Sequence, residues 1–148
     1  MVFHITREAK KYYEKLDKST TGKLKTEFDF YYLCLLAGFS RGKVSQNNGV
    51  EFYDKFPNEF YHQRQQVIGL LISTEIERRG VNVNDNVQVE KIILYIVKPD
   101  SVTLLSNEGE KLLDQYAQNG FELISDEIPV ERISNLDTFL AQFYELIK

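Results

Sequence analysis

Phe28 to Lys43 reads FDFYYLCLLAGFSRGK, and this stretch decides the fold. The residues from Phe30 to Phe39 carry no charge, and on a helix their apolar side chains would point in every direction. A helix that is apolar on all sides is buried in a protein core or in lipid. Crossing a bilayer takes about 20 such residues, so this run is too short for a membrane segment. It predicts a central core helix, covered by the rest of the chain or partly by another subunit.

Helical patterns with N-terminal caps lie on both sides of this run. Thr6 is expected to cap a helix that ends near Ser19, with Glu8 in the first turn, where the helix dipole favours an acid. Four more helices are expected over 58–79, 86–97, 106–118 and 136–147, beginning at Asn58, Asp85, Ser106 and Asn135. The first of these four should end at Gly80 and bury Phe60, Val67, Leu70, Leu71 and Ile76.

Three segments are less regular. The β-branched residues of 86–97 also suit a strand, but a helix is favoured because no convincing partner strand is present. The stretch SRGKVSQNNGVEFYDKFPNEFY, residues 40–61, reads as a long loop, with Phe52, Tyr53 and Phe56 expected to fold back onto the surface of the core. Residues 121–129 read as extended or irregular chain, since Asn119 and Gly120 look like a helix stop. The predicted fold is mainly α: a compact single-domain bundle of about six helices over residues 1–148.

Composition fits an ordinary globular protein. The chain has 148 residues, of which 43% are hydrophobic and 27% charged, as expected for one domain with a real core. A single cysteine excludes an internal disulfide framework and fits a reducing compartment. The first residues, MVFHITREAKK, lack the apolar region of a secretory signal. We therefore expect a cytoplasmic protein.

Charge is unevenly distributed along the chain. Residues 1–43 hold nine Lys and Arg against five Asp and Glu, whereas residues 100–148 hold three against ten. The net charge is −4 overall, +4 in the basic N-terminal part (residues 1–43) and −7 in the acidic C-terminal part (residues 100–148). Such a local field favours binding of a partner, because partners respond to the nearby charges rather than to their sum. A solvated surface without a role is the alternative.

Residues for catalysis or metal binding are scarce. The two histidines, His4 and His62, have no further ligand at metal-binding spacing, and one cysteine cannot form a zinc site. Cys34 lies in the apolar run and reads as core packing. Gly22-Lys23 lacks the rest of a phosphate-loop motif, and the acids of NEGE and DEIPVE read as solvated surface. We expect no enzyme activity, metal or cofactor.

Basic residues in the N-terminal part (residues 1–43) form a candidate nucleic-acid surface. Lysines and arginines recur on one side of the first helix and in the two segments that follow it, a pattern that can hold a phosphate backbone without reading bases. The candidates are Arg7, Lys10, Lys11, Lys15, Lys18, Lys23, Lys25, Arg41 and Lys43. A merely solvated face is the alternative, since acids on the same helix dilute the field and the pI is about 5.3.

The first hundred residues resemble DndE, the small component of bacterial DNA phosphorothioation (DNA sulfur modification) gene sets. The resemblance lies in ITREAKKYYEKL, the following Thr-containing turn with Gly22, the FDFYYLCLLAGFS helix and the later Leu-Leu helix that ends in Gly80. It implies an accessory, DNA-associated protein without catalytic residues, with Lys10, Lys23 and Lys25 as phosphate contacts. The acidic segment after Pro99 has no counterpart in the family's pattern.

Aromatic residues after the central run are candidate protein contacts, because Tyr and Phe are enriched at interfaces. They are Phe52, Tyr53, Phe56, Phe60 and Tyr61. We therefore expect a non-catalytic accessory protein of a prokaryotic DNA-modification or anti-phage defence system, which binds DNA backbone, partner proteins from the same gene set, or both. The alternative is an interaction adaptor or homo-oligomer that binds no nucleic acid.

Overall fold

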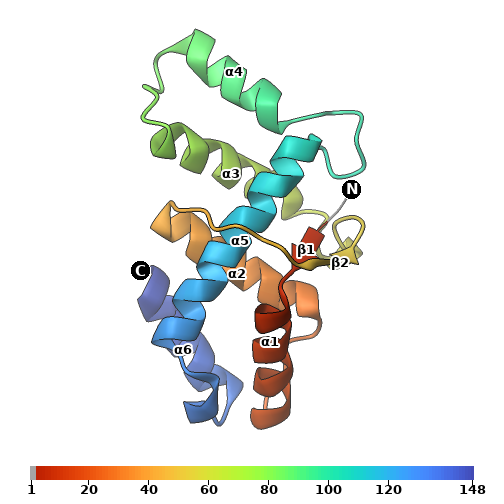
Figure 1. Cartoon of the computed structure of the whole chain (residues 1–148), viewed down its shortest axis with the longest axis vertical. Coiled ribbons are helices and arrows are strands. Elements are labelled where there is room, and N and C mark those ends of the chain that lie inside the picture. Colours follow the sequence, from red (N-terminus) through yellow and green to blue (C-terminus); the bar gives the residue numbers. More distant parts are fainter. Residues whose placement is uncertain (1–2) are drawn as a thin grey trace.

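The structure is a computed structural model that describes residues 3–148, and it confirms the mainly α fold (Figure 1). Six α-helices are present in the described chain: α1 (Arg7–Ser19), α2 (Glu27–Arg41), α3 (Arg64–Arg78), α4 (Asn86–Ile96), α5 (Asn107–Glu127) and α6 (Leu136–Ile147). Two short strands, β1 (Phe3–Ile5) and β2 (Val50–Tyr53), pair antiparallel, and two 3₁₀ turns, η1 (Asn58–Phe60) and η2 (Val130–Arg132), complete the order.

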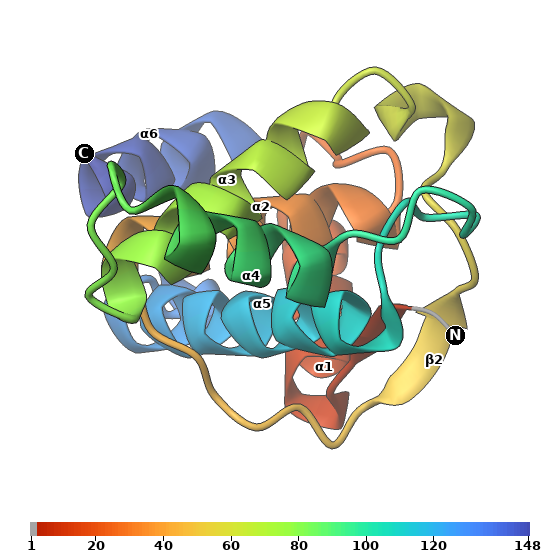
Figure 2. The ribbon, with the colours of Figure 1, turned by 90° about the horizontal axis from the view of Figure 1, so that it is seen from above.

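The crossing of α2 and α5 forms the centre of the molecule. In Figure 1, α5 runs from the end occupied by α3 and α4 to the end occupied by α1 and α6, and Figure 2 shows α4 lying over α5 in the view from above. At the crossing the two backbones touch, because a Cβ placed on Gly38 would lie 2.0 Å from the carbonyl oxygen of Tyr116. The same atom on Gly120 would lie 1.7 Å from the oxygen of Cys34. Two glycines thus permit the closest helix contact in the core.

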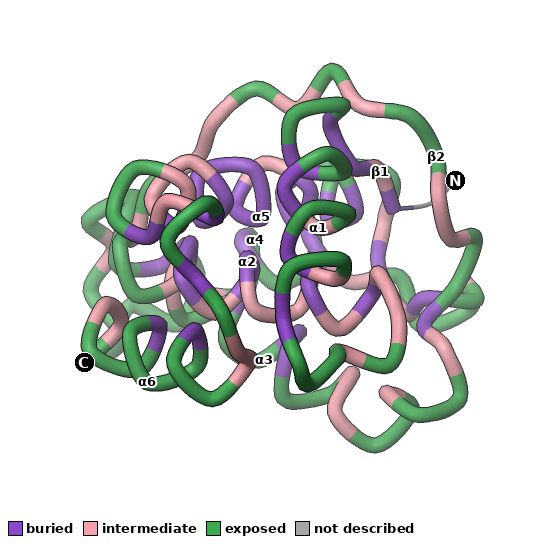
Figure 3. The backbone as a smooth tube through the Cα atoms, turned by 90° about the horizontal axis from the view of Figure 1, so that it is seen from below, coloured by how far each residue is buried: buried purple, intermediate pink, exposed green. Residues whose placement is uncertain are grey.

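The apolar run is the central core helix that its pattern predicts. In α2, Phe28, Phe30, Tyr31 and Leu35 are fully or almost fully buried. Burial raises the pKa of the Cys34 thiol well above its usual range, which keeps it protonated and unreactive. Figure 3 shows that buried residues line the inner side of the neighbouring helices, while their outer sides are exposed.

Aromatic side chains fill one part of this core. Phe3 of β1 packs edge-on against Phe28 and Phe56, with ring centroids 5.5 and 4.9 Å apart. Tyr12 of α1 stacks on Phe30 of α2 at 5.5 Å. Edge-to-face and offset-stacked pairs of this kind are the favoured arrangements of aromatic rings. They join β1, α1 and the segment after β2 to the first half of α2.

Helix caps confirm most of the expected boundaries. Thr6, Asp85, Ser106 and Asn135 each accept a hydrogen bond from a backbone N–H in the first turn of α1, α4, α5 and α6. The choice of helix over strand for 86–97 is therefore confirmed. Gly80 follows α3 with a positive φ of 67°, as expected of a helix stop.

Two helix boundaries and one strand were predicted wrongly. Asn58 begins only the 3₁₀ turn η1, and α3 starts six residues later, at Arg64, with its Leu70 exposed rather than buried. The helix α5 continues through Gly120 to Glu127, because contact with α2 requires a glycine there inside a helix. Residues 50–53 form β2 instead of loop, since β1 supplies a partner strand.

Candidate nucleic-acid interface

The helix α1 separates a buried apolar stripe from an exposed basic one. Ala9, Tyr12 and Leu16 face the core. The cations Arg7, Lys11, Lys15 and Lys18 recur at intervals of three and four residues on the opposite side, and all four are exposed. A row of cations at this spacing follows one side of the helix from its first turn to its last.

The α1–α2 loop, residues 20–26, carries two further cations in a fixed conformation. Thr20 ends α1 by donating its hydroxyl to the carbonyl oxygens of Leu16 and Gly22, at 2.8 and 2.7 Å. At the other end, the carboxylate of Asp29 accepts from the Thr26 N–H at 2.7 Å, which forms a capping box at the start of α2. Between these anchors the exposed residues Lys23 and Lys25 alternate with the half-buried Leu24.

Lys10 lies near the start of α2. Burial raises the pKa of the Glu27 carboxyl, and the positive charge of Lys10 lowers it in part. Lys10 is thus close enough to Glu27 to affect its ionisation. The structure therefore brings the two loop lysines and Lys10 to the same end of α2.

Arg41 and Lys43 lie elsewhere. They stand at the C-terminal end of α2, a helix of 15 residues that is about 22 Å long. In Figure 1 that end points away from α1. The predicted basic rim thus divides into two parts: seven residues on α1 and the α1–α2 loop, and two at the far end of α2.

Few acids neutralise these cations. Within residues 3–148, ion pairs of the nine candidates join Lys15 to Glu131 at 3.9 Å and Lys23 to Asp17 at 4.0 Å. Both pairs are long, and both lysines are about two-thirds exposed. Pairs of this kind contribute little to stability. The basic side chains therefore remain accessible to an anionic partner.

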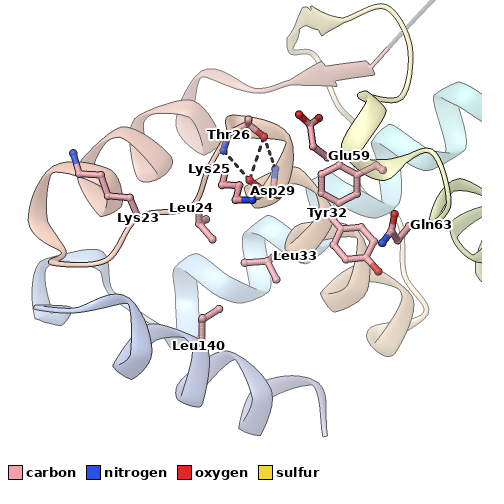
Figure 4. Close-up of a pocket in the computed structure, with 11 residues that line it drawn as sticks. Lys23, Leu24, Lys25, Thr26, Asp29, Tyr32, Leu33, Glu59, Gln63 and Leu140 are labelled. Atoms are coloured by element: carbon pink, nitrogen blue, oxygen red, sulfur yellow. Dashed lines mark hydrogen bonds between the residues drawn. The ribbon is translucent and has the colours of Figure 1, made fainter.

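A pocket of about 470 Å³ opens beside the α1–α2 loop (Figure 4). Its floor is apolar and comes from three elements: Leu24 of the loop, Leu33 of α2 and Leu140 of α6. Two aromatic rings form a wall, Tyr32 and Phe60, with centroids 5.2 Å apart. This volume lies in the range of small-molecule sites, and the mixture of apolar floor and polar rim is typical of them.

Charged and amide groups surround the mouth of this pocket. Figure 4 shows Lys25 beside Asp29, while Lys23 extends away from the pocket along the loop. Glu59 and Gln63 lie on the opposite side, next to the aromatic wall. The Oε1 atom of Gln63 is shielded from solvent and has no hydrogen-bond partner among residues 3–148. The rim thus has a cationic side at Lys25 and an acidic side at Glu59.

The predicted protein contacts are largely part of the aromatic core. Phe56 is only 6% exposed, and Phe52, Tyr53 and Phe60 are half-buried against Phe28. Tyr61 alone among the five is exposed, at 53%, with the Arg64 guanidinium 4.0 Å from its ring. Exposed aliphatic side chains occur instead on and around α4: Val83, Val87, Leu94 and Val102.

A buried polar cluster that the sequence did not reveal joins β1, α2 and α5. The Asp114 carboxylate accepts from the His4 backbone N–H at 3.0 Å and the Tyr31 hydroxyl at 2.6 Å, and lies 2.9 Å from His4 Nδ1. The Asn47 amide donates to the carbonyl oxygens of His4 and Asp114, each at 3.1 Å. Burial outweighs the hydrogen bonds from His4 and Tyr31 and raises the pKa of the Asp114 carboxyl to about 6.

One acid of NEGE, Glu110, was wrongly predicted to be solvated surface. It is 5% exposed and accepts a hydrogen bond from Thr103 at 2.7 Å, and Asp114, for which no prediction was made, is equally buried. A helical-wheel signal for this burial exists, since residues 110 and 114 fall on the same side as the buried Leu113, Ala117 and Phe121.

Metal-ligand clusters and membrane-spanning helices are both absent from residues 3–148. Within the described part of the chain, His, Cys, Asp and Glu side chains nowhere gather in groups of three or more that would hold a metal ion. No helix in residues 3–148 combines the length and apolarity required to cross a membrane.

Comparison with known proteins adds no relative. The chain matches no protein-family model, and neither curated proteins nor solved structures give a significant match. The resemblance to DndE stays a prediction.

Proposed function

We propose that this chain is a cytoplasmic, non-catalytic accessory protein of a prokaryotic DNA-modification or anti-phage defence system, and that it binds the DNA backbone. The observation that carries this proposal is the exposed basic surface of α1 and the α1–α2 loop, called here the basic surface: Arg7, Lys10, Lys11, Lys15, Lys18, Lys23 and Lys25. Lysine and arginine side chains that replace condensed counterions supply most of the affinity of sequence-independent DNA binding.

The mechanism would be electrostatic. The row of cations on α1 contacts successive phosphates, while the anchored loop presents Lys23 and Lys25 at a fixed distance from the helix. Because phosphate contacts position a protein without reading sequence, this surface alone gives no base preference. Arg41 and Lys43 face another direction and are expected to contribute little.

Charge reversal tests the proposal. Lys10→Glu, Lys23→Glu and Lys25→Glu combined should weaken binding of a fluorescent duplex at least tenfold at 50 mM salt. The slope of log affinity against log salt should also fall, because fewer counterions are released. Fluorescence anisotropy at several salt concentrations measures both quantities.

A matched control has the same net charge. Lys55→Glu, Lys91→Glu and Lys98→Glu change three exposed lysines outside the basic surface. This variant should lose affinity only slightly, through the long-range field. Equal losses in the two variants, or no duplex binding by the natural chain at low salt, would contradict the proposal.

The exposed aliphatic residues around α4 favour a second candidate function, that of a protein-interaction adaptor or homo-oligomer. Val87 and Leu94 lie seven residues apart on the outer side of α4 and are 63% and 69% exposed. Size-exclusion chromatography with light scattering tests self-association directly. A dimer that becomes a monomer on Leu94→Ser, while DNA binding is unchanged, would support this function.

A further inference from the structure

The pocket beside the α1–α2 loop lies next to the basic surface and differs from it chemically. The basic surface offers only cations, whereas the pocket offers an apolar floor, an aromatic wall and hydrogen-bond acceptors. A phosphate backbone alone would leave this cavity empty. A ligand that uses both features must carry a phosphate and, next to it, a flat and largely apolar group with N–H donors.

We propose that this pocket binds one unpaired nucleotide, whose base enters the cavity while its phosphate contacts the loop lysines. This inference rests on the proposed function, because the loop lysines belong to the same basic surface. Two sources of such a nucleotide are distinguished by the experiment below: an unpaired position in a DNA strand and a free mononucleotide.

The loop itself orients such a ligand. Side chains alternate along Lys23, Leu24 and Lys25, so that Leu24 points into the cavity while the two lysines flank it (Figure 4). Lys25 lies at the mouth and Lys23 further out along the loop. A strand that follows the loop therefore places one phosphate at Lys25 and a neighbouring one towards Lys23. The base attached at Lys25 then lies over Leu24.

The aromatic wall formed by Tyr32 and Phe60 can stack against a nucleotide base. Tyr32 and Phe60 are half-buried rings that come from α2 and η1, and together with Leu33 they offer apolar surface for stacking. Stacking of bases on aromatic side chains is the common way in which proteins hold single strands. The Tyr32 ring is kept in position by Phe60, so little side-chain freedom is lost on binding.

The charges of the rim fix the direction of the ligand. Thr26 donates to the Asp29 carboxylate at 2.7 Å from its backbone and at 3.2 Å from its hydroxyl, so that this acid is occupied in the capping box. Glu59 is exposed on the opposite side and repels phosphate there. The Glu59 carboxylate accepts hydrogen bonds from the amino groups of adenine, cytosine or guanine, whereas thymine has no amino group. We therefore expect thymine to bind most weakly.

The experiment compares three DNA probes of equal duplex length: blunt, with a single-stranded dA overhang, and with a dT overhang. Fluorescence anisotropy should give at least about fivefold tighter binding of the dA overhang than of the blunt duplex, the low end of stacking on one aromatic group. The dT overhang should lie between them. In a fourth probe, 2-aminopurine replaces the first overhanging adenine and should change its fluorescence on binding.

Leu140→Trp tests the cavity, because Leu140 is 37% exposed and lines the floor, so a larger side chain fills the space without disturbing the core. The variant should bind the blunt duplex normally and lose the preference for the dA overhang. Tyr144→Trp is the control: it lies one turn later on α6, is 62% exposed and does not line the pocket. It should behave as the natural chain.

The outcomes separate the two proposals. Normal binding of blunt duplex without any overhang preference, or a preference that Leu140→Trp leaves intact, overturns the nucleotide pocket and leaves the proposed function standing. Absence of binding to every DNA probe contradicts the proposed function. In that case a titration with dAMP, followed by NMR of the backbone amides, decides the pocket: shifts around Leu24 and Leu33 that Leu140→Trp abolishes support a free nucleotide, and no shifts overturn the inference.

Discussion

Gly120 of α5 lies so close to Gly38 of α2 that a Cβ on Gly120 would stand 2.6 Å from the Gly38 nitrogen. Since the obstructing atoms are backbone, the helices themselves must move apart to accept any side chain. The contact lies at the crossing of α2 and α5, the centre of the molecule. The stability of the fold therefore depends on the absence of a side chain at both Gly38 and Gly120.

Gly120→Ala should unfold the protein or lower its free energy of unfolding by at least about 3 kcal/mol, the range of severe overpacking. Gly69→Ala is the control, because no described atom outside its own helix neighbourhood lies within 4 Å of its added Cβ. That change should stabilise the chain by about 0.5–1 kcal/mol through helix propensity. Urea unfolding followed by circular dichroism measures both. Similar stabilities of the two variants would contradict the close contact.

The buried Asp114 gives stability a distinctive pH dependence. Its pKa is raised from 3.8 to about 6 in the folded chain, so the folded state binds more protons than the unfolded state between these values. This contribution to the free energy of unfolding is largest below about pH 4 and is lost as the pH rises through about 6. Relative to Asp114→Asn, the natural chain should gain up to about 3 kcal/mol between pH 7 and pH 4.

Urea unfolding of both proteins at several pH values measures this difference. The comparison with the variant removes the contributions of the other carboxylates, which the two chains share. A constant difference from pH 4 to pH 7 would show that Asp114 keeps an ordinary pKa.

A second buried acid, Glu75, should give stability the opposite pH dependence. Burial raises the pKa of this carboxyl, but hydrogen bonds from Arg78, Tyr116 and Arg79 outweigh burial and leave it lowered. Arg78 and Arg79 donate at 2.6 Å and the Tyr116 hydroxyl at 2.7 Å. The ionised Glu75 therefore adds to the free energy of unfolding at pH values above the pKa that this carboxyl has in the unfolded chain. That addition is lost as the pH falls through the lower pKa of the folded chain.

Glu75→Gln should therefore lower the free energy of unfolding by about 1–3 kcal/mol at pH 7, because it weakens charge-assisted bonds to a fully buried group. Glu77→Gln, an exposed change on the same helix, should have an effect below about 0.5 kcal/mol. Thermal unfolding of the two variants tests this. Equal melting temperatures would contradict a stabilising role for Glu75.

Glu131 of η2 partly neutralises the basic surface, through its 3.9 Å pair with Lys15. Glu131→Gln should strengthen duplex binding by at most about fivefold at low salt, the size of one charge interaction at this distance in water. The gain should vanish at high salt. Glu145→Gln, which removes the partner of Lys148 on α6, has the same net charge and should bind as the natural chain does. Equal gains in both variants would indicate a general charge effect.

Local signals predicted the helices well. Caps such as Thr6, Asp85 and Asn135 act within one turn, so the residues that decide them are neighbours in the sequence. Gly120 was misread because its reason lies in α2, more than eighty residues earlier. The strand β2 was missed for the same reason, since its partner is β1 at the other end of the first half of the chain.

In the candidate site, too, only the features that depend on neighbouring residues could be predicted from the sequence. The basic residues of α1 and the loop could be assigned from spacing alone, and all of them are exposed. The pocket could not be predicted, because Leu24, Leu33, Phe60 and Leu140 come from four separate elements. The separation of Arg41 from α1 depends on the direction of α2, which no local pattern specifies.

The link between His4 and Asp114 spans 110 residues. A ribosome adds about 5–20 residues each second, so His4 waits roughly 5–20 s for Asp114 to be made. During that interval Phe3 and Ile5, both buried in the finished protein, have no helix α5 to cover them. The contact between β1 and α5 can thus form only late in synthesis, and chaperones that bind nascent apolar segments have time to meet β1 before it forms.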